Sequence, residues 1–232
     1  MNPSRRQFLL ALAGLACAPL ARAGDWSAIT AAEAGQALRD SLSQGARAAI
    51  ARLGRENGYF DNARIKIGLP HNFAKAERYL RLLGMGRQVD DLVLSMNRAA
   101  EAAAPEARDV VLDTVHKMTV GDAKAILAGG DGAATAWFRQ NTETQLGDKL
   151  APIIHRVAEQ SDLVRSYDAL SGTLAKLAGI KSELATVEAY VNHKALDGLY
   201  TLIAEEEHAI RARPLHHAGD VVGKVFGVLN RE

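Results

Sequence analysis

Three polar residues, Asn97, Arg98 and Glu101, interrupt a stretch that is otherwise mostly apolar between residues 89 and 103. The apolar residues there have helical spacing, and a helix that is apolar on most sides is expected to be buried on more than one face. Arg98 and Glu101 are three positions apart, so their side chains can meet on that helix. The group is therefore either a structural ion pair or a site where a guanidinium recognises a carboxylate or phosphate.

A second polar group lies in a long predicted helix over residues 184–211. Lys194 and Asp197 can pair within this helix, and Gly198 would let another backbone approach closely. Three glutamates follow at 205–207, and one is expected to face the interior because apolar residues bracket them. A solvated acidic face is the simpler alternative. The candidate binding residues are Asn97, Arg98, Glu101, Asp197, Glu205 and Glu206.

Two carboxylate–histidine pairs, Asp113 with His116 and Glu205 with His208, have the spacing with which helical bundles hold two iron ions. Such a centre needs two further carboxylates, which the two polar groups above contain. The same spacing is common by chance, so we assign no metal ligand and leave the cofactor open. No complete catalytic motif is present, and no catalytic residue is assigned.

The composition is that of an ordinary globular protein with a helical bias. Of 232 residues, 48% are hydrophobic and 24% are charged, and alanine and leucine dominate the apolar set. The net charge of +1 gives no support for a nucleic-acid partner or an anionic membrane surface. The single cysteine is Cys17, so the chain after it is expected to have no disulfide and no thiolate chemistry.

Residues 1–23 are expected to be a cleaved export signal. Arg5 and Arg6 precede a short apolar run, and small residues form a cleavage site after Ala23. The sequence around the two arginines is similar to the twin-arginine export signal, with a general secretory leader as the alternative. Lipidation at Cys17 is a further alternative, although the residues before it form a poor lipidation motif. We expect a periplasmic protein whose mature chain has no transmembrane segment.

Helical spacing of apolar residues extends over nearly all of the remaining chain. The exception is residues 65–69, where apolar and other residues alternate. Because no partner strand is evident, this segment is predicted to be extended chain lying along the helices. These patterns predict an all-α single domain over residues 24–232, a multi-helix bundle of about eight to ten helices. The helices at 89–103 and 184–211 are expected to form its core pair.

Several residues mark where helices should begin. Thr119 and Asp122 form a predicted capping box. Asp131 is predicted to cap a helix over residues 132–141, and Thr142 to start another one. Pro152 implies a kink or a restart within that last helix.

The two polar groups lie within strings that resemble a bacterial family of exported proteins catalogued as a domain of unknown function. The strings are Leu94–Glu101, Ala128–Thr135, Lys194–Tyr200 and Leu202–Glu207. The resemblance extends from about Ala37 to Phe226 and implies a single domain exported to the bacterial envelope, without implying an activity. At His116 and His208 the family pattern often has lysine, which weakens the metal hypothesis.

We expect a non-catalytic envelope protein that binds a small ligand or an envelope protein through a groove between helices. The alternatives are an enzyme that uses inward carboxylates for acid–base chemistry and a metal-binding helical bundle. Convergence of Glu101, Asp197 and Glu205 with Arg98 in one cleft would favour the enzyme. Arg98 is expected to be buried and paired with one of these three carboxylates, and Arg98→Ala to lower thermal stability sharply.

Overall fold

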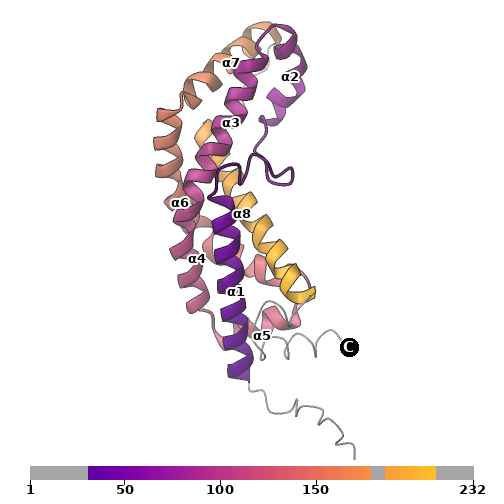
Figure 1. The fold of residues 1–232 in the computed structure, drawn as a ribbon, viewed down its shortest axis with the longest axis vertical. Helices are drawn as coiled ribbons and strands as arrows, with labels where there is room; N and C mark the ends of the chain where they lie inside the picture. Colours follow the sequence, from indigo (N-terminus) through magenta and orange to yellow (C-terminus); the bar gives the residue numbers. More distant parts are fainter. Residues whose placement is uncertain (1–30, 179–185, 213–232) are drawn as a thin grey trace, which may run out of the picture.

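The computed structural model describes residues 31–178 and 186–212, and every regular element in these residues is a helix (Figure 1). The helices are α1 (Ala31–Leu53), α2 (His71–Leu82), α3 (Gly86–Ala103), the short 3-10 helix η2 (Ala104–Glu106), α4 (Ala107–His116), α5 (Val120–Ala128), α6 (Ala133–Gln160), α7 (Leu163–Ala178) and α8 (Val187–Ala212). The predicted all-α class is confirmed. The predicted number of helices and the export signal both involve residues outside the described ranges, and they stay predictions.

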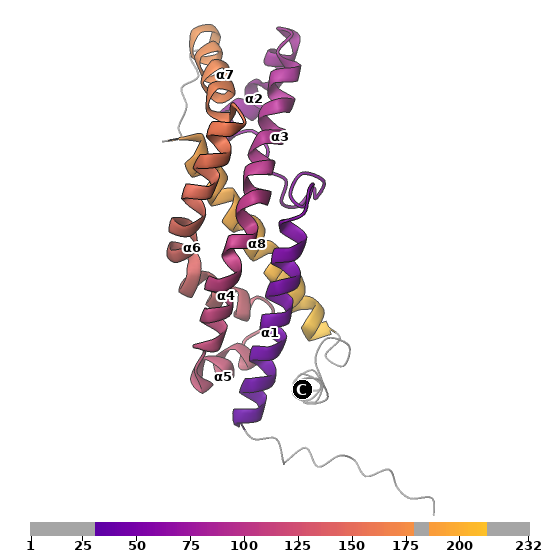
Figure 2. The ribbon, with the colours of Figure 1, turned by 60° about the vertical axis from the view of Figure 1, so that its left-hand side comes forward.

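The helices form an elongated bundle with different elements at its two ends (Figures 1 and 2). One end carries α2, α7 and the start of α3, and the other carries α5. A continuous cluster of buried apolar side chains runs through the bundle. In α3, Ala99, Ala100 and Ala103 are fully buried, and such small side chains let neighbouring helices approach closely.

The most extensive helix contact in the described residues joins α6 and α8, so the predicted core pair of α3 and α8 is wrong. The reason is the length of α6, which runs for 28 residues and accompanies α8 over much of the bundle (Figure 2). In contrast, α3 divides its buried surface among α6, α7, α8 and α2. The helices predicted over residues 132–141 and from Thr142 onward are one continuous helix, so the predicted boundary between them is wrong.

The continuity of α6 contradicts two predicted features. Thr142 does not begin a helix, because it lies inside α6. Its hydroxyl donates to the carbonyl oxygen of Phe138 at 2.7 Å, as threonine does within a helix. Pro152 lies inside the helix and does not divide it, so the predicted restart is wrong, whereas the alternative of a kink stays a prediction. A proline in this position removes one backbone hydrogen bond, which a helix of this length tolerates when its apolar face is buried.

The predicted capping box at the start of α5 is confirmed. The Thr119 hydroxyl accepts a hydrogen bond from the backbone N–H of Asp122 at 3.1 Å, and the Asp122 carboxylate accepts one from the backbone N–H of Thr119 at 2.9 Å. Both partners are close in the chain, which is why the spacing alone identified them.

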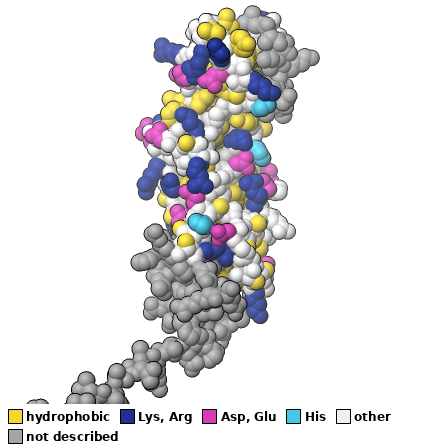
Figure 3. Space-filling model, turned by 90° about the vertical axis from the view of Figure 1, so that its right-hand side faces the viewer, with side chains coloured by type: hydrophobic (Ala, Val, Ile, Leu, Met, Phe, Trp, Pro, Cys, Tyr) yellow, Lys and Arg dark blue, Asp and Glu magenta, His cyan; other side chains and the backbone are white. Residues whose placement is uncertain are grey.

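Large exposed apolar side chains gather at the end of α2, where Tyr79, Leu82 and Leu83 face solvent. Figure 3 shows hydrophobic side chains at this end of the molecule, with basic and acidic side chains intermixed along the middle of the same face. Among the described helices, none combines the length and the apolar character needed to cross a bilayer.

Candidate functional site

Glu101 holds the loop between α1 and α2 through its carboxylate. Its Oε1 accepts hydrogen bonds from the backbone N–H groups of Tyr59 and Phe60, both at 3.1 Å. Its Oε2 accepts one from the Arg98 guanidinium at 2.5 Å. Because Glu101 is only 4% exposed, these bonds satisfy a charge whose burial would otherwise be costly. This geometry favours the structural interpretation of the group over a ligand site.

Asn97 fixes the extended segment that leads into α2. Its Oδ1 accepts a hydrogen bond from the backbone N–H of Ile67 at 2.9 Å, and its Nδ2 donates to the carbonyl oxygen of the same residue at 2.8 Å. One side chain thus satisfies both backbone groups that a neighbouring strand would otherwise pair. The prediction of extended chain lying along the helices is confirmed here.

Arg98 pairs with Glu101, as the spacing predicted, but its surroundings differ from the prediction. Its Nη2 also contacts Glu56 at 3.1 Å and the Oδ1 of Asn57 at 2.8 Å, both in the loop after α1. The side chain is 32% exposed, so the expectation that Arg98 is buried is wrong. The two α8 carboxylates considered as partners pair with other arginines.

The inward-facing member of the glutamate run is Glu207, which is 3% exposed. Its carboxylate accepts hydrogen bonds from the backbone N–H groups of Ala134 at 3.0 Å and Thr135 at 2.9 Å, at the start of α6. It also pairs with Arg211 at 3.0 Å. A carboxylate at this position satisfies free N–H groups and is stabilised by the helix dipole. One inward glutamate was predicted, but Glu207 was not among the candidate residues.

The predicted cap of this helix, Asp131, has a different contact. Its carboxylate lies 3.0 Å from Nδ1 of His208. The N-cap position belongs to Gly132, whose φ of 87° lies in the left-handed region that glycine adopts without strain. A distant side chain, that of Glu207, therefore does the capping that the sequence assigned to a local one.

A cavity of about 420 Å³ opens between the extended segment, α6 and α8. Its volume is typical of small-molecule sites, which occupy about 300–1,000 Å³. The charged side chains that line it are Arg64, Lys66, Arg139, Lys194 and Asp197. We call this cavity the cationic groove, because four of the five lining charges are positive.

Asp197 lies between two of the groove's cations. It contacts Arg139 at 3.2 Å and Lys194 at 3.4 Å. The Arg139 guanidinium also pairs with Glu143 at 3.1 Å and lies over the Tyr200 ring, 4.5 Å from the centroid. These contacts hold Arg139 in one orientation, so the groove has a fixed wall on the α6 side.

Gly198 makes room for an aromatic ring. The prediction that another backbone approaches closely at this residue is wrong. A Cβ atom at this position would lie 2.4 Å from Cε1 of Tyr59. The Tyr59 hydroxyl crosses to α8 and donates to the carbonyl oxygen of Ala195 at 2.8 Å. Burial, and next the negative charge of Glu101, raise the pKa of Tyr59, which keeps the phenol protonated as a donor.

The remaining candidate carboxylates do not converge on the groove. Glu205 pairs with Arg64 at 3.0 Å and with Arg52 at 3.5 Å. Glu206 lies where α8 crosses α1 at Gly45. Of the candidate carboxylates in the described residues, only Asp197 lines the groove. The convergence that would favour an enzyme is therefore not found there.

The two carboxylate–histidine pairs have separate environments. Asp113 and His116 are exposed on α4. Glu205 faces arginines, and His208 contacts Asp131. Within residues 31–178 and 186–212, no three side chains of the metal-binding types are grouped so that they could hold an ion.

Three charged groove residues, Arg64, Lys66 and Arg139, do not belong to the polar groups predicted from the sequence. For the first two a signal existed, because they alternate with the buried Ile65 and Ile67 and so face the opposite side of an extended chain. No comparable signal marks Arg139, whose position depends on how α6 packs against α8.

Comparison with known proteins supplies a family and no activity. Neither the curated proteins nor the solved structures contain a match to this chain. A family model described as "Protein of unknown function (DUF4197)" matches residues 28–227, a range that includes every described helix and all groove residues. The resemblance seen in the sequence is thereby confirmed, and the chain belongs to the DUF4197 family.

Proposed function

We propose that this protein is a non-catalytic binding domain of the bacterial envelope, and that its ligand is a small anion carrying two or more negative charges. The observation that carries the proposal is the charge of the cationic groove, whose lining has four positive side chains and one carboxylate. Both arginines of the lining pair with carboxylates outside it, Arg139 with Glu143 and Arg64 with Glu205. The lysines are less fully compensated, since Lys194 shares Asp197 with an arginine.

Lys66 is a groove cation without a close ion pair in the described residues, although the Asp90 carboxylate is near enough to interact with its charge. Its ammonium lies over the Phe60 ring, 3.7 Å from the centroid. Two side chains fix the segment that carries Lys66. Asn97 binds the backbone of Ile67, and the Tyr190 hydroxyl donates to the carbonyl oxygen of Gly68 at 3.0 Å. Side chains on a fixed segment lose less freedom when a ligand binds, which favours affinity.

Binding is favoured over acid–base catalysis because the inward carboxylates already have partners. Glu101 accepts three hydrogen bonds, and Asp197 has two cations beside it. A general acid or base needs a carboxyl group within reach of a substrate proton. The observed pairing gives no support to that alternative, and no observation favours a second function.

The test measures the binding of pyrophosphate and of citrate to the purified protein by isothermal titration calorimetry. The variant combines Lys66→Gln and Lys194→Gln, which removes two charges from the groove while leaving the arginine–carboxylate pairs in place. At least a tenfold loss of affinity is expected, together with weaker binding at higher salt concentration because the ligand contacts are partly exposed.

The matched control combines Arg156→Gln and Lys176→Gln, two exposed cations on α6 and α7 outside the groove. Its affinity should equal that of the wild type. An equal loss of affinity in the control variant would mean that the anions respond to overall charge. The proposal would be refuted if neither pyrophosphate nor citrate binds.

Export to the periplasm belongs to the same proposal and rests on residues 1–23. Mass spectrometry of protein from the envelope fraction should show Gly24 as the first residue. Replacing Arg5 and Arg6 with lysine should block export by the twin-arginine route. Continued export would indicate the general secretory route, and a lipid on Cys17 would show that the chain is anchored instead of cleaved after Ala23.

A further inference from the structure

A second cavity, of about 380 Å³, lies on another part of the molecule, between α1 and the η2–α4 region. We call it the two-arginine cleft. Its lining residues are Arg47, Ile50, Ala51, Gly54, Pro105 and Arg108. None of them lines the cationic groove, so the cleft is a separate site.

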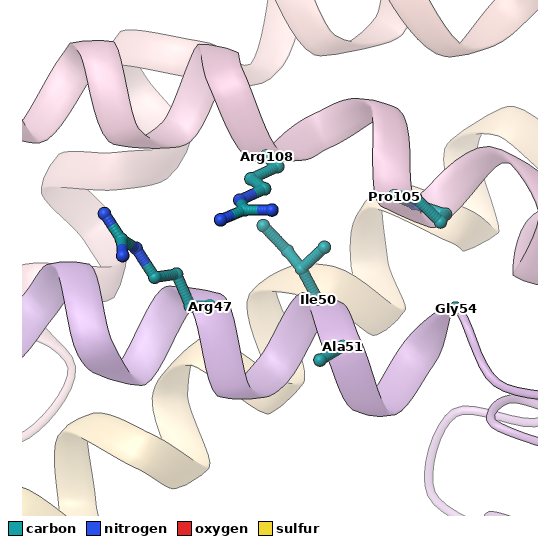
Figure 4. Close-up of a pocket in the computed structure, with 6 residues that line it drawn as sticks. All are labelled: Arg47, Ile50, Ala51, Gly54, Pro105 and Arg108. Carbon is teal, nitrogen blue, oxygen red and sulfur yellow. The ribbon is translucent and has the colours of Figure 1, made fainter.

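The lining of the cleft is divided into a charged part and an apolar part. In Figure 4, Arg47 of α1 and Arg108 of α4 lie on one side of Ile50, with both guanidinium groups in the gap between the two helices. Gly54 and Pro105 lie on the other side of Ile50. There the two elements are in close contact, because a Cβ atom at 54 would lie 2.8 Å from Cγ of Pro105.

The two arginines have no acidic partner among the described residues. Both side chains are exposed, and neither forms an ion pair or a hydrogen bond with the part of the chain that the structure describes. No acidic residue lines the cleft. Two guanidinium groups that share a gap repel one another, and an anion between them would relieve that repulsion.

We propose that the two-arginine cleft binds an amphipathic anion, a carboxylate or phosphate head group attached to a short apolar chain. The planar guanidinium groups match the oxygens of either head group. The exposed apolar surface of Ala51 and Pro105, with the mostly buried Ile50 between the two helices, would receive the chain. Burial of each methylene group there strengthens binding about fourfold. This ligand differs from that of the cationic groove, which offers several charges and no comparable division of its lining.

The probe is octanoate, used below the concentration at which it forms micelles, and binding is measured by isothermal titration calorimetry. Acetate supplies the head group alone, and octanol supplies the chain alone. Octanoate should bind at least tenfold more tightly than either, and hexanoate should bind more weakly than octanoate. Octyl phosphate distinguishes a phosphate head group from a carboxylate, and binding of either anion supports the proposal.

Three variants assign the binding to the cleft. The variant that combines Arg47→Gln and Arg108→Gln should bind octanoate at least tenfold more weakly, while its affinity for octanol stays unchanged. Ala51→Phe, at an exposed helix position, should fill the apolar part of the cleft and weaken the binding of both octanoate and octanol. The control pair Arg78→Gln and Arg156→Gln removes two exposed arginines outside the cleft and should leave octanoate binding unchanged.

The outcomes separate this proposal from the one for the cationic groove. Loss of octanoate binding in the Lys66→Gln, Lys194→Gln variant would place the amphiphile in the groove and overturn the assignment to the cleft. Equal binding of octanol and octanoate would show that the arginines do not recognise a head group. Circular dichroism at 222 nm on each variant excludes misfolding as the cause of a loss.

Discussion

Two buried glutamates, Glu101 of α3 and Glu207 of α8, use the same chemistry in two regions of the molecule. Each carboxylate accepts hydrogen bonds from two consecutive backbone N–H groups that are distant in the chain, and each pairs with an arginine on its own helix. Glu101 holds a loop, whereas Glu207 holds the start of a helix. The arginines differ in exposure, at 32% for Arg98 and 13% for Arg211.

The difference shows how the surroundings set the value of the same contact. At α6 the N–H groups already point along the helix axis, and the helix dipole adds to the attraction for a carboxylate. In the loop, the N–H groups of Tyr59 and Phe60 lie outside any regular helix, so no helix dipole adds to their attraction for a carboxylate. We therefore expect the Glu207 anchor to contribute more to stability than the Glu101 anchor.

The largest effect is expected for Glu207→Ala. The change leaves the nearly buried guanidinium of Arg211 without this carboxylate and removes the acceptor of two N–H groups, which should lower the free energy of unfolding by about 4 kcal/mol. Urea denaturation followed by circular dichroism measures it. The control, Glu206→Ala, changes the neighbouring and less buried glutamate and should cost under about 1 kcal/mol.

Arg98→Ala tests the other anchor. It removes a charge-assisted hydrogen bond to Glu101 and two contacts to the loop, and it should cost about 3 kcal/mol in the same measurement. Water can reach the vacated space because Arg98 is partly exposed, so the loss should be smaller than for Glu207→Ala. Arg55→Ala, in the same loop, is the control and should be nearly neutral. A larger loss for Arg98→Ala than for Glu207→Ala would reverse the comparison.

Gly198→Ala tests a second contact of the loop that Glu101 holds. Here the Tyr59 ring of that loop packs against α8. The added Cβ atom would lie 2.4 Å from the ring, so the ring or the helix must move, at a cost of about 2 kcal/mol. Gly172→Ala in α7 meets nothing within 4 Å and should raise thermal stability. If both changes raise the melting temperature, the Tyr59 contact does not constrain α8.

Thr119→Ala extends the comparison to a helix that is capped locally, and it should cost about 1 kcal/mol. Hydrogen bonds from Thr119 hold the pKa of the Asp122 carboxyl below its ordinary value. A lowered pKa in the folded state contributes stability above the unfolded pKa of about 3.9 and loses it as the pH falls through the folded pKa. The difference in the free energy of unfolding between wild type and variant should therefore become smaller in acid. A difference that does not change with pH would exclude this linkage to the Asp122 pKa.

The local features of this fold could be predicted from the sequence, because their partners lie within a few positions. The Thr119–Asp122 box and the Arg98–Glu101 pair both follow from spacing along a helix. The extended segment was recognised from alternation alone. The polar character of Asn97 in an apolar helix also marked it correctly as a residue that needs a partner.

The long-range features could not be predicted, because they depend on packing between distant segments. Nothing in the spacing indicates that Glu101 meets the backbone of Tyr59, which is 42 positions away, or that Glu207 caps α6 from 73 positions away. The two-arginine cleft is of the same kind, since Arg47 and Arg108 come from separate helices. At Pro152 the local preference of proline against a helix interior is overridden by the burial of a long helix.

The contact between Gly198 and Tyr59 also limits how this protein can evolve. A mutation that adds a side chain at 198 is acceptable only after the residue at 59 has become smaller, because the ring occupies the space of the missing Cβ atom. A smaller residue at 59 would in turn give up the hydroxyl that binds the carbonyl oxygen of Ala195. Each single step is therefore expected to lower the free energy of unfolding, so a change at one position favours a change at the other.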